Sequence, residues 1–431
     1  MLIAAALLLA ACAPVDGPAD RPPDREPVRV DESLGVVRVA PGSPVEVRMT
    51  LDVDGDDEAL SALLEAAFAA AIEDFGAVQQ GFRVHLGKPI ATSCDRGSGE
   101  RAGRTLAEEA VEQQVVGVLG PQCTATLLGL QGPASDAGLA IVTPRPQEVT
   151  LTEGPDGTIG QDRRDGVFRT APSGLAEARA AARHAIEDLE LARAAAFHDG
   201  TIESLALAEA FRLTFESDGG TVVATQQVDA SLAGSDGAVE ALGPLLDAVT
   251  TNEADVILLA LEGDALLMML EALSGRTRLS GIARLTTSTG AGTDVLSDDA
   301  SSGLLIAGPA LAFPDAVSAV TGMSASQTFE RVSAASGVPE PSGWWAYAYD
   351  AATLLLKAIE DSSLVDVDGS FVLSRADLRE TLIRTRIGGL TGQVRCGANG
   401  DCAAPVIVIR ERSPESATTL AELPVTAVLG D

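Results

Sequence analysis

The sequence predicts an α/β protein whose parallel sheets form two successive units, and three observations carry this prediction. Short apolar segments of strand length alternate with segments whose apolar residues recur at helical spacing, which is typical of parallel sheets covered by helices. The alternation begins near residue 45 and starts again after residues 168–170. A chain of 431 residues is also long for one core, so two domains are favoured.

The elements of the first unit are expected between residues 45 and 142. Its strands are predicted at residues 45–51, 82–86, 115–119 and 140–142. The first helix is predicted from apolar side chains at helical spacing and ends at Gly76; these are Leu60, Leu63, Leu64, Phe68, Ile72 and Phe75. Further helical patterns run through residues 106–111 and 127–130. Each later strand therefore follows a helix, as parallel pairing requires.

The second unit repeats the alternation, and a shorter section follows it. Its strands are predicted at residues 194–197, 221–225, 256–261 and 282–286. The shorter section is predicted to contain a strand at 304–307, a helix at 347–359, a helix start at Ser374, and tail strands at 392–396 and 406–409. Because a return section follows two units, the chain is expected to cross between two lobes several times. That topology is typical of hinged binding proteins.

Residues 1–11 are predicted to be a signal peptide. This apolar run is too short for a membrane span, which takes roughly 20 residues, but it fits a signal-peptide core. It ends in Leu9-Ala10-Ala11-Cys12, which resembles the bacterial lipobox, so Cys12 is predicted to be lipidated and to anchor the exported protein at the cell surface or in the periplasm. An ordinary secretory signal is the alternative. Residues 12–44 are predicted to form a Pro-rich tether, and attachment is expected by lipid only.

The cysteine count is typical of an oxidising compartment. With Cys12 assigned to the lipid, the even set Cys94, Cys123, Cys396 and Cys402 remains, and it allows three pairings. Cys396 and Cys402 bracket a Gly/Asn/Asp turn and are predicted to pair, which leaves Cys94 to pair with Cys123. A metal site is the competing interpretation, but C-x-x-C spacing and accompanying histidines are missing.

Charge and motif content exclude several functions. Asp and Glu number 62 against 30 Lys and Arg, a formal charge of −32, and this balance argues against nucleic-acid binding. Only 3 histidines occur, too few for a multi-histidine metal centre. The G-x-S-x-G elbow and the P-loop pattern are absent. We therefore predict no enzyme activity, no cofactor and no metal.

Several short motifs share the order and spacing of one protein family. They are residues 118–126 (Val-Leu-Gly-Pro-Gln-Cys-Thr-Ala-Thr), 132–136 (Gly-Pro-Ala-Ser-Asp), 140–144 (Ala-Ile-Val-Thr-Pro), 168–171 (Phe-Arg-Thr-Ala), 349–356 (Tyr-Asp-Ala-Ala-Thr-Leu-Leu-Leu) and 388–394 (Gly-Gly-Leu-Thr-Gly-Gln-Val). Together they resemble the leucine/isoleucine/valine-type periplasmic substrate-binding proteins of ABC transporters. The similarity spans about residues 45–409.

The resemblance implies a fold, a ligand site and a partner. Family members have two Rossmann-like lobes joined by three crossover strands, the type I periplasmic-binding-protein fold, with the ligand in the cleft and an ABC permease as partner. With the strand counts, the family's crossover order predicts lobe one at residues 45–168 and 308–388. Lobe two is predicted at residues 169–307 and 389–431.

Two segments of the first lobe are candidates for ligand contact. Ligands bind beyond the carboxyl ends of parallel strands, where helix N-termini offer N–H groups to anions. Thr124, Ala125 and Thr126 follow the strand at 115–119 and could hold a ligand carboxylate, although either threonine could instead cap the helix. Arg145 and Gln147 stand where the resemblance implies small and hydroxyl-bearing residues. Arg145 could clamp a carboxylate, face solvent or pair with a neighbouring acid.

The second lobe departs further from the family pattern. Amino-acid-binding members hold the ligand ammonium with an acidic residue, but Thr289 stands at that place in this sequence. Glu262 could replace the missing acid or could only cap the helix that begins at Gly263. With Arg145 adding positive charge, we expect a ligand that carries a carboxylate and lacks an α-ammonium, unless Glu262 supplies the acid.

These observations predict a lipid-anchored extracytoplasmic protein that captures a small polar ligand for an ABC permease. The ligand is expected to be an amino acid or a related carboxylate or amide. A ligand sensor of the same fold, signalling to a membrane partner without transport, is the alternative. A secreted hydrolase with paired carboxylates is a third hypothesis.

Overall fold

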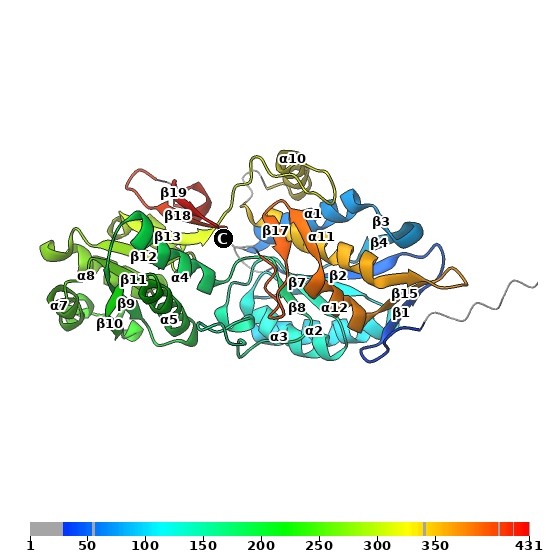
Figure 1. Cartoon of the computed structure of the whole chain (residues 1–431), viewed down its shortest axis with the longest axis horizontal. Helices are drawn as coiled ribbons and strands as arrows, with labels where there is room; N and C mark the ends of the chain where they lie inside the picture. Colours follow the sequence, from blue (N-terminus) through cyan, green and yellow to red (C-terminus); the bar gives the residue numbers. More distant parts are fainter. Residues whose placement is uncertain (1–28, 54–56, 339–341, 404–405, 417, 431) are drawn as a thin grey trace, which may run out of the picture.

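The structure is a computed structural model that describes residues 29–53, 57–338, 342–403, 406–416 and 418–430. It has two lobes, each built on a seven-stranded sheet that is covered by helices on both faces (Figure 1). The predicted signal peptide, Cys12 and residues 12–28 lie outside the described residues. Within the described ranges, no helix combines the length and the apolar character that crossing a membrane requires.

The sheet of the first lobe is parallel apart from the edge strand β3. Its order is β3-β4-β2-β6-β7-β8, with β5 paired to the end of β2. The strands are β2 (Val45–Asp52), β3 (Ala77–Val78), β4 (Phe82–Leu86), β5 (Ile90–Thr92), β6 (Gly117–Leu119), β7 (Ala140–Thr143) and β8 (Val167–Arg169). Helices on one face are α2 (Arg96–Glu112) and α3 (Thr124–Asp136), and on the other α1 (Asp57–Phe75) and α11 (Trp344–Ser362).

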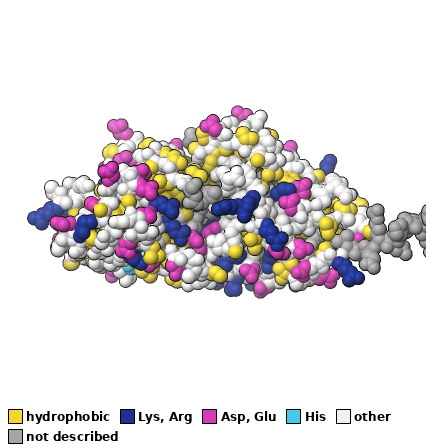
Figure 2. Space-filling view, viewed as in Figure 1, with side chains coloured by type: hydrophobic (Ala, Val, Ile, Leu, Met, Phe, Trp, Pro, Cys, Tyr) yellow, Lys and Arg dark blue, Asp and Glu magenta, His cyan; other side chains and the backbone are white. Residues whose placement is uncertain are grey.

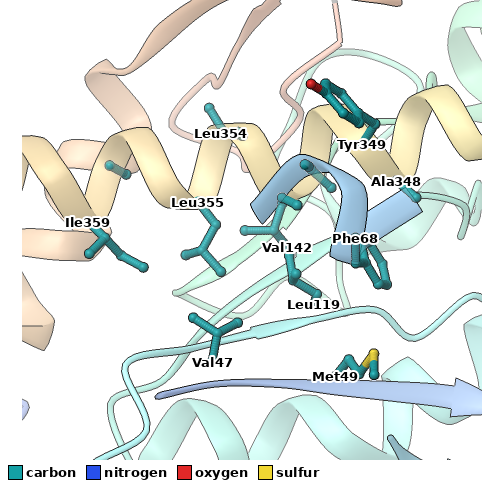
Figure 3. Packing of buried hydrophobic residues seen from close by; sticks show 14 of the residues in the cluster. Val47, Met49, Phe68, Leu119, Val142, Ala348, Tyr349, Leu354, Leu355 and Ile359 are labelled. Carbon is teal, nitrogen blue, oxygen red and sulfur yellow. The ribbon is translucent and has the colours of Figure 1, made fainter. Parts of the chain in front are cut away.

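The core of the first lobe has two layers, one on each face of the sheet, because successive side chains of a strand point to opposite faces. Val142 packs with Val47 and Met49 against the helices α1 and α11 (Figure 3). Its neighbour Ile141 belongs to the layer under α2 and α3. Because successive strand residues point to opposite faces, a strand buried on both faces needs an uninterrupted apolar run. This is the pattern by which the sequence predicted these strands.

The sheet of the second lobe has the order β10-β9-β11-β12-β13-β18-β19, and its first five strands are parallel. The strands are β9 (Arg193–His198), β10 (Thr221–Gln227), β11 (Val256–Ala260), β12 (Ala283–Thr287), β13 (Leu304–Pro309), β18 (Ile407–Glu411) and β19 (Val425–Leu429). Helices α4 (Gly174–Arg183) and α5 (Ile202–Ser217) cover one face. The opposite face carries α6 (Ala238–Ala241), α7 (Gly243–Thr251), α8 (Gly263–Ser274) and α9 (Thr293–Ser297).

The end of the predicted tether is folded. Residues 36–39 form β1 (Val36–Val39), which pairs antiparallel with β15 (Phe371–Ser374), and β14 (Ser363–Val365) completes this three-stranded sheet. The run Val-Val-Arg-Val is rich in β-branched residues, which favour strands, and Val37 and Val39 are buried in the first lobe's core. The part of 12–44 that the structure describes is therefore not wholly a tether.

The predicted boundary at residues 388–389 also lies elsewhere in the structure. Strands β16 (Arg386–Gly389) and β17 (Gly392–Arg395) form a hairpin whose buried residues pack in the first lobe's core. Asp350 of α11 holds its turn, because its carboxylate accepts hydrogen bonds from the backbone N–H groups of Leu390 and Thr391, both at 2.8 Å. The segment from 389 to Cys402 therefore belongs with the first lobe, and only the strands β18 and β19 join the second.

The chain passes between the lobes at three places. The passages run from β8 to α4, from β13 to α10 (Ala325–Ser336), and from β17 to β18, while α12 (Arg375–Arg384) stays with the first lobe (Figure 1). The expectation of two lobes with parallel sheets and repeated crossings is confirmed.

Both predicted disulfides are present. Cys94–Cys123 joins the segment after β5 to the residue that precedes α3, and Cys396–Cys402 closes the turn after β17. The first bridge spans 29 positions and the second 6, so the first constrains the longer loop.

Candidate ligand-binding site

A cavity of about 330 Å³ lies between the two lobes. The carboxyl ends of parallel strands meet at one edge of a sheet, so residues that follow neighbouring strands come together there. In the second lobe this edge supplies the residues after β9, β11 and β12, and in the first lobe the wall comes from the segment after β7. The polar wall residues used below are Glu148, Thr150, Asp162, Asp199, Glu203, Glu262, Thr287 and Thr289.

Arg169, at the end of β8, positions the first-lobe wall. Its side chain is buried, and its guanidinium donates to the backbone carbonyl of Glu148 at 2.7 Å, to that of Pro146 at 3.2 Å and to Thr152 Oγ1 at 2.6 Å. It also donates to Asp401 Oδ1 from the hairpin side of the lobe at 2.8 Å. One buried cation thus fixes the backbone that carries the Glu148 carboxylate.

Asp199 is held at the N-terminus of α5. Its Oδ1 accepts hydrogen bonds from Thr201 N at 2.9 Å, Thr201 Oγ1 at 2.8 Å and Ser204 Oγ at 2.6 Å. Burial works against ionisation of this carboxyl, but these hydrogen bonds outweigh burial and lower its pKa. Asp199 is therefore an ionised wall residue whose charge is already partly satisfied.

Glu203 stands in the first turn of α5 and interacts with Glu148 of the other lobe. Burial is the main cause that raises the pKa of Glu203 to about 9, and the charge of Glu148 and a side-chain hydrogen bond with it add to the shift. Glu262 contributes a further like charge. Carboxyl groups from both lobes therefore lie close enough to interact, and their like charges favour a proton on Glu203.

Glu262 and Thr289 both line the cavity. Glu262 stands two residues after the end of β11, and Thr289 two residues after the end of β12. Glu262 stands at the N-cap of α8, where the helix dipole favours its charge as the sequence suggested, but its side chain makes no capping hydrogen bond. Burial, with the charges of Asp199 and Glu148, raises the pKa of Glu262. Thr289 Oγ1 lies 2.9 Å from Thr287 Oγ1, so two hydroxyl groups sit side by side in this wall.

Gln147 joins the lobes instead of lining the cavity. Its amide donates to Glu177 of α4 and to Ser288 Oγ, the latter at 3.3 Å. Glu177 also accepts from Ser288 N at 2.8 Å and from Ser288 Oγ at 2.9 Å. Burial raises the pKa of Glu177 to about 8, against the opposing effect of these hydrogen bonds. Gln147 therefore connects the first lobe to the segment that carries Thr289.

The predicted threonine segment lies at the start of α3 and does not line this cavity. Thr126 is fully buried, and its hydroxyl donates to Asp52 Oδ1 at 2.6 Å. Cys123 occupies the N-cap position, so neither threonine caps the helix through that position. Thr124 and Ala125 are half-buried, and their contact with ligand stays a prediction.

Arg145 likewise lies away from the cavity. Its guanidinium carbon stands 5.9 Å from the ring centre of Trp344, a cation–π arrangement. The structure therefore brings together two of the predicted second-lobe residues, Glu262 and Thr289, but does not place Arg145 beside them.

Five carboxylates dominate the charge of the cavity wall, and we refer to Glu148, Asp162, Asp199, Glu203 and Glu262 as the cavity carboxylates. Among the described residues, no Lys, Arg or His lines the cavity. The positive charge expected from the sequence is replaced by negative charge from both lobes. Four of the five were not predicted as site residues, although Asp199 and Glu203 follow the predicted strand at 194–197, and that position could have indicated them.

The comparisons with known proteins agree with the fold. The family model described as periplasmic binding protein matches residues 44–409. A leucine-binding protein from Thermotoga maritima is 20% identical with a TM-score of 0.61, covering 90% of this chain and 99% of that one. An ABC transporter substrate-binding protein from Desulfitobacterium hafniense, in complex with leucine, is 18% identical with a TM-score of 0.65, covering 89% and 100%.

A third solved structure has a different ligand. It is a solute-binding protein from R. palustris in complex with 4-hydroxybenzoate, 16% identical with a TM-score of 0.59, covering 90% of this chain and 96% of that one. A search of the curated proteins found no significant match.

At these identities the solved structures establish the type I fold, whereas the family model, which spans most of the chain, establishes the family. Proteins of this family bind solutes outside the cytoplasm and are not enzymes, in agreement with the prediction from the sequence. The chain with its two lobes and its interlobe cavity belongs to the periplasmic binding protein family.

Proposed function

We propose that this protein captures a small polar solute outside the cytoplasm and delivers it to an ABC permease. The observation that carries the proposal is the interlobe cavity, because both lobes contribute to its wall: Glu148 and Thr150 from one, Glu262 and Thr289 from the other. A ligand that contacts both walls stabilises the state in which the lobes are together. A permease can then distinguish loaded from empty protein by its shape.

The connections between the lobes suit such a movement. Only three passages of chain join the two sheets, and the side-chain bond from Gln147 to Ser288 links the loops next to the cavity. Hinge closure requires backbone rotation at a few such connecting segments while each lobe stays rigid. The two lobes have separate buried cores, which supports their movement as rigid bodies.

A ligand screen tests the proposal. Purified protein lacking residues 1–28 is heated with amino acids, small carboxylates, amides and amines, because a bound ligand at a hundred times its Kd stabilises the folded state by about 2.7 kcal/mol. Fluorescent labels on the two lobes then report their distance. We expect one chemical class to raise Tm and to bring the labels together. A ligand that raises Tm without changing the label distance would contradict capture by closure.

We also propose that lipid on Cys12 holds the exported protein at the membrane. Growth with labelled fatty acid should label the parent protein and not the Cys12→Ser variant. If the parent stays unlabelled and leaves the cell in soluble form, the anchor is absent and the segment is an ordinary secretory signal.

A further inference from the structure

The charge of the cavity points to the class of ligand that it holds. Of the ion pairs between described residues, none includes any of the cavity carboxylates, so these charges have no Lys, Arg or His partner within that part of the chain. Carboxylates that come together from two lobes without a cation oppose closure. A cationic ligand would reverse the sign of this interaction, since each of its charges attracts both walls.

The cavity carboxylates differ in the hydrogen bonds that they already accept. Asp199 is occupied by Thr201 and Ser204, and Glu148 Oε1 accepts from Thr150 N at 3.3 Å and Thr150 Oγ1 at 3.2 Å. The hydrogen-bond partner of Glu203 is another acid, Glu148, and the Glu262 side chain makes no capping hydrogen bond, so neither carboxyl is compensated by a positive charge among the described residues. Both lie in the second-lobe wall and line the cavity. They are the groups that gain most from a donor on the ligand.

The cavity carboxylates do not form a metal site. Within the described residues, no group of three or more His, Cys, Asp or Glu side chains is arranged to hold a metal ion. Leu128, Ile202, Leu207 and Leu261 line the same cavity as the charged groups. A wall that combines several acids with aliphatic side chains matches several cationic nitrogens on an aliphatic chain.

We propose that the ligand of this cavity is a small aliphatic molecule with at least two separated cationic nitrogens and no carboxylate, such as a linear diamine or a guanidino-amine. The inference rests on the proposed function and names the ligand class of the same site. A volume of about 330 Å³ admits a molecule of this size, at the lower end of the usual range for ligand pockets. A ligand carboxylate would meet the cavity carboxylates without a compensating cation.

The proton on Glu203 allows a second test of the proposal, by the release of protons on binding. Burial and neighbouring acids keep the Glu203 carboxyl protonated at neutral pH in the empty protein, since they raise its pKa to about 9. A bound cation lowers that pKa, and the carboxyl then releases its proton. Binding of a diamine at pH 7.5 should therefore release protons, which calorimetry in buffers of different ionisation enthalpy measures.

The experiment uses isothermal titration of the parent and three variants with putrescine, agmatine, leucine, 4-hydroxybenzoate and Ca²⁺. Glu203→Gln and Glu262→Gln each remove one ionisable carboxyl group with little change in volume. Glu271→Gln, on the exposed side of α8, is the matched control for charge loss outside the cavity. We expect putrescine or agmatine to bind the parent, Glu203→Gln and Glu262→Gln to weaken binding about ten-fold or more, and Glu271→Gln to leave it unchanged. Circular dichroism and Tm establish that each variant is folded.

Several outcomes would overturn the inference. Binding of leucine or 4-hydroxybenzoate without binding of either amine would refute the ligand class and leave solute capture intact. Amine binding that is equal in all variants would show attachment to the acidic surface, where acidic side chains are scattered over both lobes (Figure 2). Ca²⁺ binding lost in Glu203→Gln and Glu262→Gln, without amine binding, would assign the charges to a metal. If no compound of any class in the wider screen binds, the proposed function fails as well.

Discussion

Glu148 of the first lobe and Glu203 of the second interact across the interlobe cavity, where burial, the charge of Glu148 and a side-chain hydrogen bond with it raise the pKa of Glu203 to about 9. The backbone of Glu148 is fixed by the buried guanidinium of Arg169, and Glu203 is fixed by the capped N-terminus of α5. Two acids held by rigid elements cannot move apart within one lobe arrangement. The repulsion between two ionised carboxylates there is relieved when one of them takes up a proton, when a cation binds, or when the lobes separate.

The stability of the ligand-free protein should fall as pH rises from about 5 to about 9. The usual glutamate pKa of 4.5 is raised to about 9 for Glu203 and to about 8 for Glu177, so the folded state keeps protons that the unfolded state releases in this range. Stability is therefore present below the unfolded pKa and is lost as pH rises through the folded value. Urea unfolding at several pH values measures this slope.

Glu203→Gln should flatten the slope, because the amide does not ionise. The control Glu271→Gln should keep the parent's slope. Equal slopes in the parent and in Glu203→Gln would show that Glu203 is not the group that holds the proton.

Replacement of Arg169 should destabilise the first lobe strongly. Arg169→Met leaves Asp401 without its cation and removes the donors to the carbonyls of Pro146 and Glu148, and breaking a buried ion pair typically costs about 3–5 kcal/mol. Arg212 is the matched control, because its ion pairs with glutamates on α5 are partly exposed and worth about 0.2–1 kcal/mol. Chemical denaturation of Arg169→Met and Arg212→Met measures both. Losses of equal size would refute the structural role of Arg169.

Removal of the two disulfides should have unequal effects. The loop-closure model predicts that losing Cys94–Cys123, with its separation of 29 residues, costs about 3–4 kcal/mol. Losing Cys396–Cys402, with a separation of 6, should cost about 2 kcal/mol. Double alanine variants of each pair, unfolded in urea, test the order. Peptide mapping without reduction should find the same two pairs, and a crossed pair would contradict the assignment.

Gln147→Ala should shift the ligand-free protein towards a more open arrangement. The variant removes the side-chain bond to Ser288 and one donor to Glu177, both of which connect the first lobe to the second. Small-angle scattering should show a larger radius of gyration than the parent. In the double variant, the increase in the radius of gyration should be smaller than the sum of the increases in Gln147→Ala and Ser288→Ala, since the two side chains share the same contacts. An unchanged radius in both variants would show that this link does not bias the lobes.

The sequence predicted the sheets well, since their central strands are buried on both faces and form apolar runs. The strand predicted at residues 194–197 lies inside the buried β9, and the one at 82–86 coincides with β4, in which buried or half-buried residues alternate with exposed ones. It missed β1 because the Pro-rich residues before it indicated a tether. It missed the helix α10 and the strands β14, β15 and β19, which lie outside the two regular units.

The site was predicted less completely. Thr289 and Glu262 were candidates because the resemblance to the family drew attention to the loops after the strands at 282–286 and 256–261, and both line the cavity. Arg145 was a candidate from the same resemblance, yet its guanidinium lies against Trp344, because the rotamer and neighbours of a long side chain are not set by its place in the sequence.

By itself, the sequence indicated the two parallel sheets through apolar periodicity, and the cysteine pairs through turn residues and an even count. The order and spacing of its short motifs indicated the family through resemblance. Only the tertiary structure decided that acids from separate lobes share one cavity. Glu148 and Glu203 belong to different lobes, and no local pattern relates them. Their meeting depends on how three passages of chain set one lobe against the other, and the raised pKa of Glu203 follows from its burial and from the neighbouring charge of Glu148.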